Sequence, residues 1–238
     1  MTLLGKDLKL TFGRRNQKLD KLAHILGKPI YSLSLLSGYT CPGAHQCLAK
    51  AIQTPEGFRI QNGPEQIYRC YSASQEVLYP NVYKARLKNW TLLREAKTRP
   101  KMRDLIISSL PPKADIVRLH VGGDFFCQNY FDSWIDVANL QPMRSIYGYT
   151  KALAYWVRRL DQMPQNFRLI ASYGGRYDDL IEEYGLPSAT VVFSQEEAEE
   201  RGLLLDFTDE RAFRGETFGL LVHGTQRKKV VKPQEPSA

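Results

Sequence analysis

The sequence predicts an α/β protein built as a partial (β/α) TIM-like barrel of about six parallel strands. Two observations predict this fold. After Pro112, short runs rich in β-branched and aromatic residues alternate with helical stretches. These runs are nearly continuously apolar, which is typical of parallel strands covered on both faces. The chain of 238 residues is long enough for one large domain.

The first elements surround a pair of cysteines. Residues 1–28 are polar and basic, and we expect an N-terminal arm that packs on the body. Residues 30–36 (IYSLSLL) alternate apolar and polar side chains and predict the first strand. The loop CPGAHQC, with Cys41 and Cys47, follows that strand.

The segment from Glu65 to Ser109 has a helical character. Pro80 and Pro100 interrupt it, because proline lacks a backbone donor and disfavours helix in the residue before it. Three short helices are therefore predicted.

The remaining strands follow at regular intervals. They are predicted at residues 116–121, 145–150, 167–172, 189–194 and 218–223. We expect residues 1–226 to form a single α/β domain, and residues 227–238, with charges and two prolines, to form a flexible tail.

Composition restricts the classes of protein. A hydrophobic fraction of 43% excludes disorder for most of the chain, and no apolar run approaches the roughly 18 residues of a membrane span. Lys6 and Asp7 interrupt the apolar start that a signal peptide needs, so we expect a cytoplasmic protein with no membrane contact. The net charge of +8 favours a phosphate-bearing partner such as a nucleotide or nucleic acid.

Four cysteines without an export signal are expected to be free thiols or metal ligands rather than disulfides. Cys41 and Cys47 follow the first predicted strand, Cys127 follows the second, and Cys70 precedes a helix that could aim it at the same loop. This placement predicts an iron–sulfur site whose thiolate ligands are gathered from these four positions. Buried, inert cysteines are the alternative.

Polar residues follow every predicted strand, and the carboxyl ends of parallel strands are where ligands bind. The candidates for binding a cofactor or another anion are Gly122, Gly123, Asp124, Arg118, Lys151, Ser172 and Arg176. His120 and His223 lie at strand ends and could support the ligands; as a strand histidine, each could equally be a core residue.

A basic run lies between Tyr83 and Arg103. It could follow a nucleic-acid backbone while an aromatic side chain stacks on a base, although a basic helix is more often a solvated surface. The candidate nucleic-acid contacts are Lys84, Arg86, Lys88 and Trp90.

Several motifs carry a resemblance to a known family. In order, SGYTCPGAHQC, YRCYSASQE, VRLHVGGDFF, YTKAL, NFRLIASYGGR and LLVHGTQ resemble the phage-associated gene product 88 proteins over about residues 31–226. That resemblance implies an infected host cell and no particular activity.

A more distant similarity in layout is to radical S-adenosylmethionine (SAM) enzymes, whose partial barrels carry a three-cysteine loop after the first strand and a Gly-Gly-acidic motif after the second. It implies that Gly122, Gly123 and Asp124 would hold the SAM amino group. The sequence departs from that pattern, because the loop is not C-x3-C-x2-C and Cys127 follows the motif.

Three functions remain open. The thiolates of all four cysteines would saturate one [4Fe–4S] cluster, which indicates a redox role with an unidentified electron donor or acceptor. Three thiolates leave one iron open, as in a radical SAM enzyme acting on a nucleotide or nucleic acid. The third function is a zinc-stabilised nucleic-acid-binding protein. The preferred prediction is the saturated cluster in a barrel without SAM chemistry.

Overall fold

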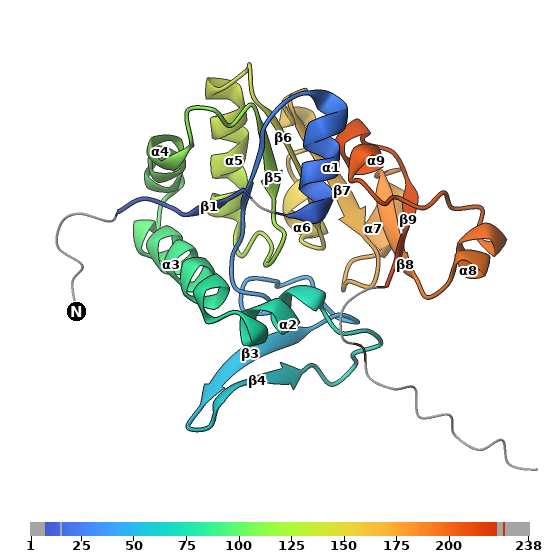
Figure 1. The fold of residues 1–238 in the computed structure, drawn as a ribbon. Helices are drawn as coiled ribbons and strands as arrows, with labels where there is room; N and C mark the ends of the chain where they lie inside the picture. The colour runs from blue at the N-terminus through green and yellow to red at the C-terminus, as the bar shows by residue number, and fades with distance from the viewer. Residues whose placement is uncertain (1–7, 15, 223–225, 227–238) are drawn as a thin grey trace, which may run out of the picture.

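A mostly parallel sheet of seven strands forms the body of the protein in the computed structural model, which describes residues 8–14, 16–222 and 226 (Figure 1). Its strands, in spatial order, are β1 (Phe12–Gly13), β2 (Ile30–Leu33), β5 (Ile116–Leu119), β6 (Ser145–Thr150), β7 (Phe167–Ser172), β8 (Ser188–Val192) and β9 (Phe218–Leu221). Every neighbouring pair from β2 to β9 is parallel, and β1 alone is antiparallel, at the edge. The predicted α/β class and its six parallel strands are confirmed.

The parallel strands follow one another across the sheet in chain order. Since crossover connections are right-handed, an unreversed order places the helices that connect the strands from β2 to β8 on the same face. The helices packed against that face are α3 (Pro80–Ala96), α4 (Arg99–Ser109), α5 (Gln128–Leu140), α6 (Leu153–Val157) and α7 (Asp179–Glu183). Strand residues at alternate positions, such as Val117 and Leu119 of β5, complete this larger core.

The opposite face of the sheet carries a smaller core beneath α1 (Gln17–Leu26) and α9 (Glu210–Arg214). Leu19 and Leu22 of α1 pack there with Ile116 and Tyr147. Thus the segment expected to be an arm contributes a strand, β1, and a helix with a buried apolar stripe. The sequence prediction missed this helix, whose apolar positions recur every three to four residues between Lys and Asp.

The predicted division of the helical segment into three is confirmed. α2 (Tyr71–Leu78), α3 and α4 follow one another, and Pro80 and Pro100 lie in the first turns of α3 and α4. Proline suits that position, because the first N–H groups of a helix have no intrahelical acceptor. The remaining short helices are η1 (Leu160–Gln162) and α8 (Gln195–Glu200).

A two-stranded hairpin not predicted from the sequence lies between Cys47 and Cys70. Its strands are β3 (Ala49–Thr54) and β4 (Gly57–Asn62), paired in register from Ala49–Asn62 to Thr54–Gly57. Figure 1 shows it below the main sheet, beside α2. Pro55 and Glu56 form the connection, and Gly57 takes a positive φ of 119°. Alternating residues on either side of a Pro-x-Gly turn were the available signal.

Two predictions fall outside this description. His223 and the tail at 227–238 lie outside the described residues. Within residues 8–14, 16–222 and 226, no helix has the length and apolar character needed to cross a membrane.

The packing of α5 on the sheet gives a stability prediction. Trp134 of α5 is fully buried in the larger core, whereas Leu140 in the same helix is 56% exposed. Trp134→Ala should lower the free energy of unfolding by about 3–5 kcal/mol, because it leaves a cavity, and Leu140→Ala by no more than about 0.5 kcal/mol. Urea unfolding followed by circular dichroism measures both. Equal small losses would contradict this packing.

Candidate functional site

The cysteine loop lies against the carboxyl ends of the parallel strands. The backbone N–H of Gln46 donates to the carbonyl of Gly174 (3.0 Å), and the N–H of Arg176 donates to the carbonyl of Gly43 (2.9 Å). A Cβ on Gly43 would come within 1.9 Å of the carbonyl oxygen of Lys151, so only glycine allows this approach. The loop after β2 is thereby joined to the segments after β6 and β7.

Asp124 connects three of these segments. Its Oδ1 accepts hydrogen bonds from the hydroxyl of Thr150 (2.7 Å) and the N–H of Phe125 (2.7 Å), and its Oδ2 accepts one from the N–H of Lys151 (2.8 Å). Its own N–H donates to the hydroxyl of Thr40, one residue before Cys41 (3.2 Å). Burial raises the pKa of Asp124 to about 6, although these donors favour the carboxylate.

The thiols of Cys41, Cys47 and Cys70 are electrostatic neighbours at this end of the sheet. All three side chains are half-buried, and burial is the main reason that the pKa of each is raised, for Cys47 to about 11. Cys70 raises the pKa of both Cys41 and Cys47, and Cys47 raises that of Cys41. Three of the four predicted ligands therefore share one environment.

Each of the three thiols also has a group that favours its thiolate. The N–H of Gly38 donates to Sγ of Cys41 (3.3 Å). The charge of Lys151 lowers the pKa of Cys47, and the first N–H groups of α2 together with Arg86 lower that of Cys70. Lys151 itself is held by Ser172, whose carbonyl and hydroxyl each accept from Nζ (2.8 Å). These groups partly oppose the effect of burial on the thiolates.

Cys127 lies apart from this group in its interactions. It precedes α5 and is half-buried; burial raises the pKa of its thiol, with Asp132 as the charged neighbour that adds to this. Electrostatic influence thus links Cys41, Cys47 and Cys70, and Cys127 as a fourth ligand stays a prediction.

The three thiols do not form a ready site for a single ion. Among residues 8–14, 16–222 and 226, no group of three or more His, Cys, Asp or Glu side chains is arranged to hold a metal ion. His45, within the cysteine loop, forms an ion pair with Glu65 instead.

Some of the predicted anion-binding residues already contact other parts of the protein, and others are exposed. Lys151 donates a hydrogen bond to Ser172. Gly122 is buried, and Gly123 takes a φ of +81° and packs against Thr40. Arg176 is exposed. The side chain of Arg118 points to the other face of the sheet, where it forms a buried ion pair with Asp209 (3.3 Å).

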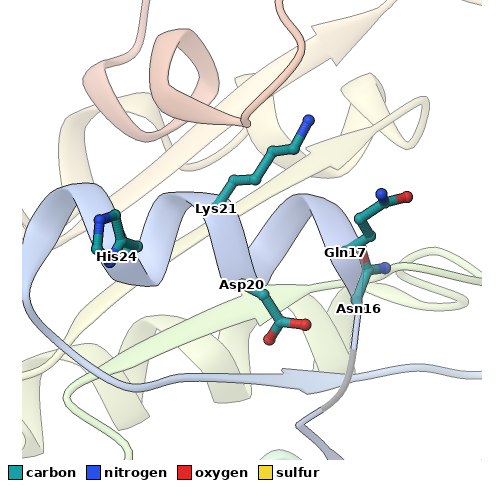
Figure 2. Close-up of a pocket in the computed structure, with 5 residues that line it drawn as sticks. All are labelled: Asn16, Gln17, Asp20, Lys21 and His24. Atoms are coloured by element: carbon teal, nitrogen blue, oxygen red, sulfur yellow. The ribbon is translucent and has the colours of Figure 1, made fainter.

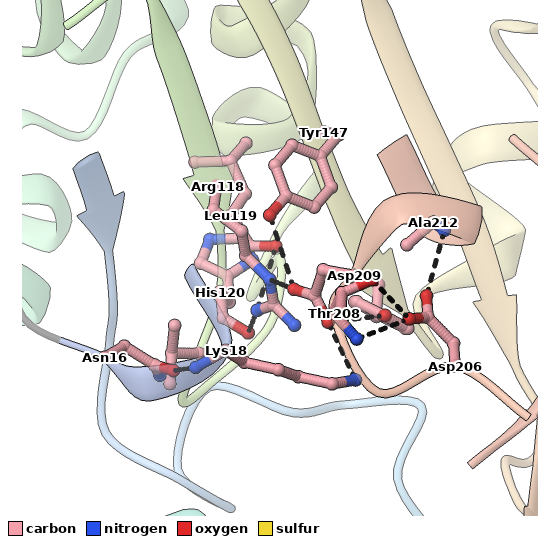
Figure 3. Close-up of polar contacts among 12 residues, drawn as sticks. Asn16, Lys18, Arg118, Leu119, His120, Tyr147, Asp206, Thr208, Asp209 and Ala212 are labelled. Atoms are coloured by element: carbon pink, nitrogen blue, oxygen red, sulfur yellow. Dashed lines mark hydrogen bonds and ion pairs between the residues drawn. The ribbon is translucent and has the colours of Figure 1, made fainter. Parts of the chain in front are cut away.

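Figure 3 shows that Asp209 is the centre of a polar network under α1. Lys18 of α1 pairs with Asp209 (2.9 Å), and the hydroxyls of Tyr147 and Tyr149 donate to it (3.3 and 3.0 Å). The carbonyl of His120 accepts from Arg118 (2.5 Å). This network joins α1 to the sheet on the face that carries the smaller core.

His120 is nevertheless buried on the side of the larger core. Its Nε2 lies 3.0 Å from the hydroxyl of Tyr130, and its Nδ1 has no hydrogen-bond partner among the described residues. Burial, aided by the charge of Arg118, lowers its pKa from 6.5 to about 3. The imidazole is therefore neutral at pH 7.

The basic run of residues 83–103 does not form one surface. Arg86 points inward and is 6% exposed; its Nη1 donates to Glu76 (2.8 Å) and to the hydroxyl of Ser72 (2.6 Å). Arg99 pairs with Asp136 (2.6 Å). Lys84 is exposed, and Lys88 and Trp90 are half-buried. Of the four predicted nucleic-acid contacts, Arg86 is thus committed to an internal ion pair.

Several residues of the site were missed from the sequence. Glu76 is fully buried, and its Oε1 also accepts from the N–H of Ser37 (3.0 Å), while its Oε2 has no partner among the described residues. Tyr68 donates to the carbonyl of Tyr173 (3.4 Å), and its pKa is raised by burial and by Cys47 and Cys70. A buried glutamate in a polar helix has no local sequence signal, because its partner lies ten residues away on the next helix.

A separate depression of about 570 Å³ lies along the exposed side of α1 (Figure 2). Its lining residues are Asn16, Gln17, Asp20, Lys21 and His24. None of the predicted site residues lines it, so it is distinct from the cysteine group.

The fold and site define an α/β protein with a group of half-buried thiols at the carboxyl end of a parallel sheet. The chain matches the model of the family described as Gene product 88 over residues 2–237 and belongs to that family. This confirms the resemblance carried by the motifs. Neither a curated protein nor a solved structure matches the chain, and no comparison supports the similarity to radical SAM enzymes.

Arg86 gives the first prediction from this site. Arg86→Met should lower the free energy of unfolding by about 3–5 kcal/mol, because it leaves the carboxylate of Glu76 buried without its cation. Adding Glu76→Gln should recover much of that loss, since the amide is neutral and still accepts from Ser37. Lys84→Met, an exposed change in the same helix, should cost no more than about 0.5 kcal/mol. Thermal or urea unfolding tests all three, and an additive double variant would contradict the pairing.

His120 gives a pH prediction. Because its folded pKa of about 3 lies below the ordinary 6.5, the unfolded chain binds more protons between these values, and stability falls as the pH drops from 6.5 towards 3. His120→Gln should remove a slope of up to about 1.4 kcal/mol per pH unit. Urea midpoints measured from pH 7 to pH 4 test this.

The matched control for His120 is His24→Gln, a change at an exposed histidine on α1. Asp124, with its pKa raised to about 6, acts in the opposite direction on the wild-type curve. Only the difference between variant and wild type therefore reports on His120. If the stability curves of wild type and His120→Gln against pH are parallel, the imidazole binds protons equally in the folded and unfolded states, and its folded pKa is not lowered.

Proposed function

We propose that the chain is an iron–sulfur protein whose [4Fe–4S] cluster is held by Cys41, Cys47 and Cys70. The observation that carries the proposal is the grouping of three half-buried thiols at the carboxyl end of the parallel sheet, where Cys70 raises the pKa of Cys41 and Cys47, and Cys47 raises that of Cys41. Thiolates gathered from separate segments are the ligands typical of such clusters.

The donor set fits a cluster better than a single ion. A structural zinc site needs four donors around one point, and the described residues offer no such group. A cluster binds each thiolate through a different iron, so its ligands lie farther apart. The zinc-stabilised alternative therefore has less support than the iron–sulfur proposal.

The residues around the thiols have defined roles in this proposal. Lys151, the N–H of Gly38 and the N-terminus of α2 with Arg86 favour the thiolate forms that bind metal. Burial keeps the thiols protonated in the absence of metal, so binding should release protons and strengthen with rising pH. When bound, such a cluster supplies one-electron transfer.

The fourth coordination position distinguishes two versions of the function. The sequence predicted Cys127 as a fourth ligand and a saturated cluster that exchanges electrons with an unidentified donor or acceptor. The grouping of only three thiols favours an open iron instead. It also gives the second candidate, a radical SAM enzyme, its specific support, together with the chain-order parallel strands that a partial TIM-like barrel requires.

Both versions fit a role in phage infection, within the cytoplasm of the host cell. Asp124 limits the SAM version, since Oδ1 and Oδ2 already accept hydrogen bonds from Thr150, Phe125 and Lys151. We therefore keep the redox iron–sulfur protein as the principal proposal. SAM binding is an outcome that the following experiment distinguishes.

The test is anaerobic purification of the full chain with Cys41→Ser, Cys47→Ser, Cys70→Ser and, as the matched control, Cys127→Ser. Iron, sulfide and zinc are quantified, and the reduced proteins are examined by electron paramagnetic resonance with and without SAM. Wild type and Cys127→Ser should hold about four irons each. The other three variants should lose most of their iron, because each removes one ligand of a shared cluster.

Each other result overturns part of the proposal. Loss of iron in Cys127→Ser would establish four ligands, and stoichiometric zinc without sulfide would establish the zinc protein. Retained iron in any of the other three variants would remove that residue from the site. A spectrum that shifts when SAM is added to wild type, with reductive cleavage of SAM, would favour the enzyme.

A further inference from the structure

A continuous row of cations and aromatic rings crosses the surface beside the cysteine loop. The ammonium of Lys50, on the hairpin, lies 5.0 Å from the ring centroid of Tyr39. The rings of Tyr39 and Trp90 are 5.7 Å apart and inclined by 35°. The guanidinium of Arg94 lies 4.9 Å from the ring of Trp90. Residues of three segments thus form one row, in which two adjacent rings are flanked by a cation at each end.

The α3 side of this row is a helical stripe. Tyr83, Leu87, Trp90 and Arg94 are spaced by four, three and four residues, which places them on one face of α3. Arg86 and Asn89 are buried on another face. A second aromatic pair, Phe58 and Tyr83, joins the hairpin to the helix with ring centroids 4.7 Å apart. We call the row and this pair the aromatic–basic surface.

The charge around this surface is positive. Exposed or half-buried cations on α3 and the hairpin outnumber the acidic side chains near them, Glu56 and Glu95, the first of which pairs with Arg59 (3.5 Å). Within the described residues, no ion pair involves Lys84 or Lys88. Tyr39, at the centre of the row, is 36% exposed.

We propose that the aromatic–basic surface binds single-stranded nucleic acid. Unpaired bases have free faces that stack on aromatic rings, and the phosphates between them are neutralised by lysine and arginine. A duplex hides its base faces, and an acidic peptide has no regular series of flat rings to match Tyr39 and Trp90. The surface consists of protein side chains only, so the proposed cluster supplies no direct contact to the bound strand.

The test uses the full chain and a fluorescein-labelled 20-residue oligonucleotide in three forms: single-stranded DNA, RNA of the same sequence, and the DNA duplex. Fluorescence anisotropy measures affinity at low and moderate salt. Both single strands should bind more tightly than the duplex, and their affinity should fall steeply with salt through counterion release. A preference between the DNA and RNA strands then identifies the natural class of ligand.

Two kinds of variant separate charge from stacking. Lys50→Glu/Arg94→Glu should weaken binding about tenfold or more, because it reverses the two cations of the row. Tyr39→Ala should weaken it about fivefold or more, and Tyr39→Phe should retain it, since the stacking ring remains. The matched control is Arg168→Glu, which reverses an exposed cation that lies 5.6 Å from another ring, that of Phe213, outside this surface.

Circular dichroism checks that each variant is folded, and Arg94→Glu alone replaces the double variant if the latter is not. An Arg168→Glu affinity within about twofold of wild type supports a local site. No binding of wild type at low salt, equal weakening by Arg168→Glu, or a duplex bound as tightly as the single strands would each overturn the proposal. Loss of the cluster without loss of binding would affect only the iron–sulfur proposal.

Discussion

The buried carboxylate of Asp124 is the constraint on which the geometry of the site depends. It receives hydrogen bonds from Thr150 and the N–H of Lys151, both after β6, while its own N–H reaches Thr40 in the segment that leads into the cysteine loop. A carboxylate so deeply buried is stable only when donors surround it. Three loops are therefore obliged to meet at one point, and Cys41 lies next to that point.

The same burial sets the chemistry of the thiols. Removing them from water disfavours their thiolate forms, so the chain brings Lys151 and Arg86 close to two of them. Part of the positive charge of this basic protein is thus spent inside, on thiols and on the carboxylates of Glu76 and Asp209. Some of the cations left outside lie on α3 and the hairpin, where they outnumber the nearby carboxylates of Glu56 and Glu95.

Most of the sheet could be predicted from the sequence, and the polar contacts could not. Five apolar runs gave β5 to β9, because buried parallel strands have a local signature in their composition. The hairpin has only a short alternation around its turn, and α1 only a short apolar stripe, so both were missed. The inward turn of Arg86 depends on Glu76, ten residues earlier, and the pair between Arg118 and Asp209 joins residues 91 positions apart. Contacts of that kind are fixed by tertiary packing and have no local signal.

The position of the hairpin links the thiol group to the surface beside it. The hairpin is inserted between Cys47 and Cys70, and the hydroxyl of Tyr39 donates to the carbonyl of Ala51 on β3 (3.3 Å). Gly38, whose N–H donates to Cys41, is so close to Ala49 that an added Cβ would lie 2.4 Å from its carbonyl oxygen. A ligand that stacks on Tyr39 therefore contacts the segment that positions Cys41. Because coupling free energies between two sites are reciprocal, any change that bound metal causes in ligand affinity is matched by an equal change that bound ligand causes in metal affinity.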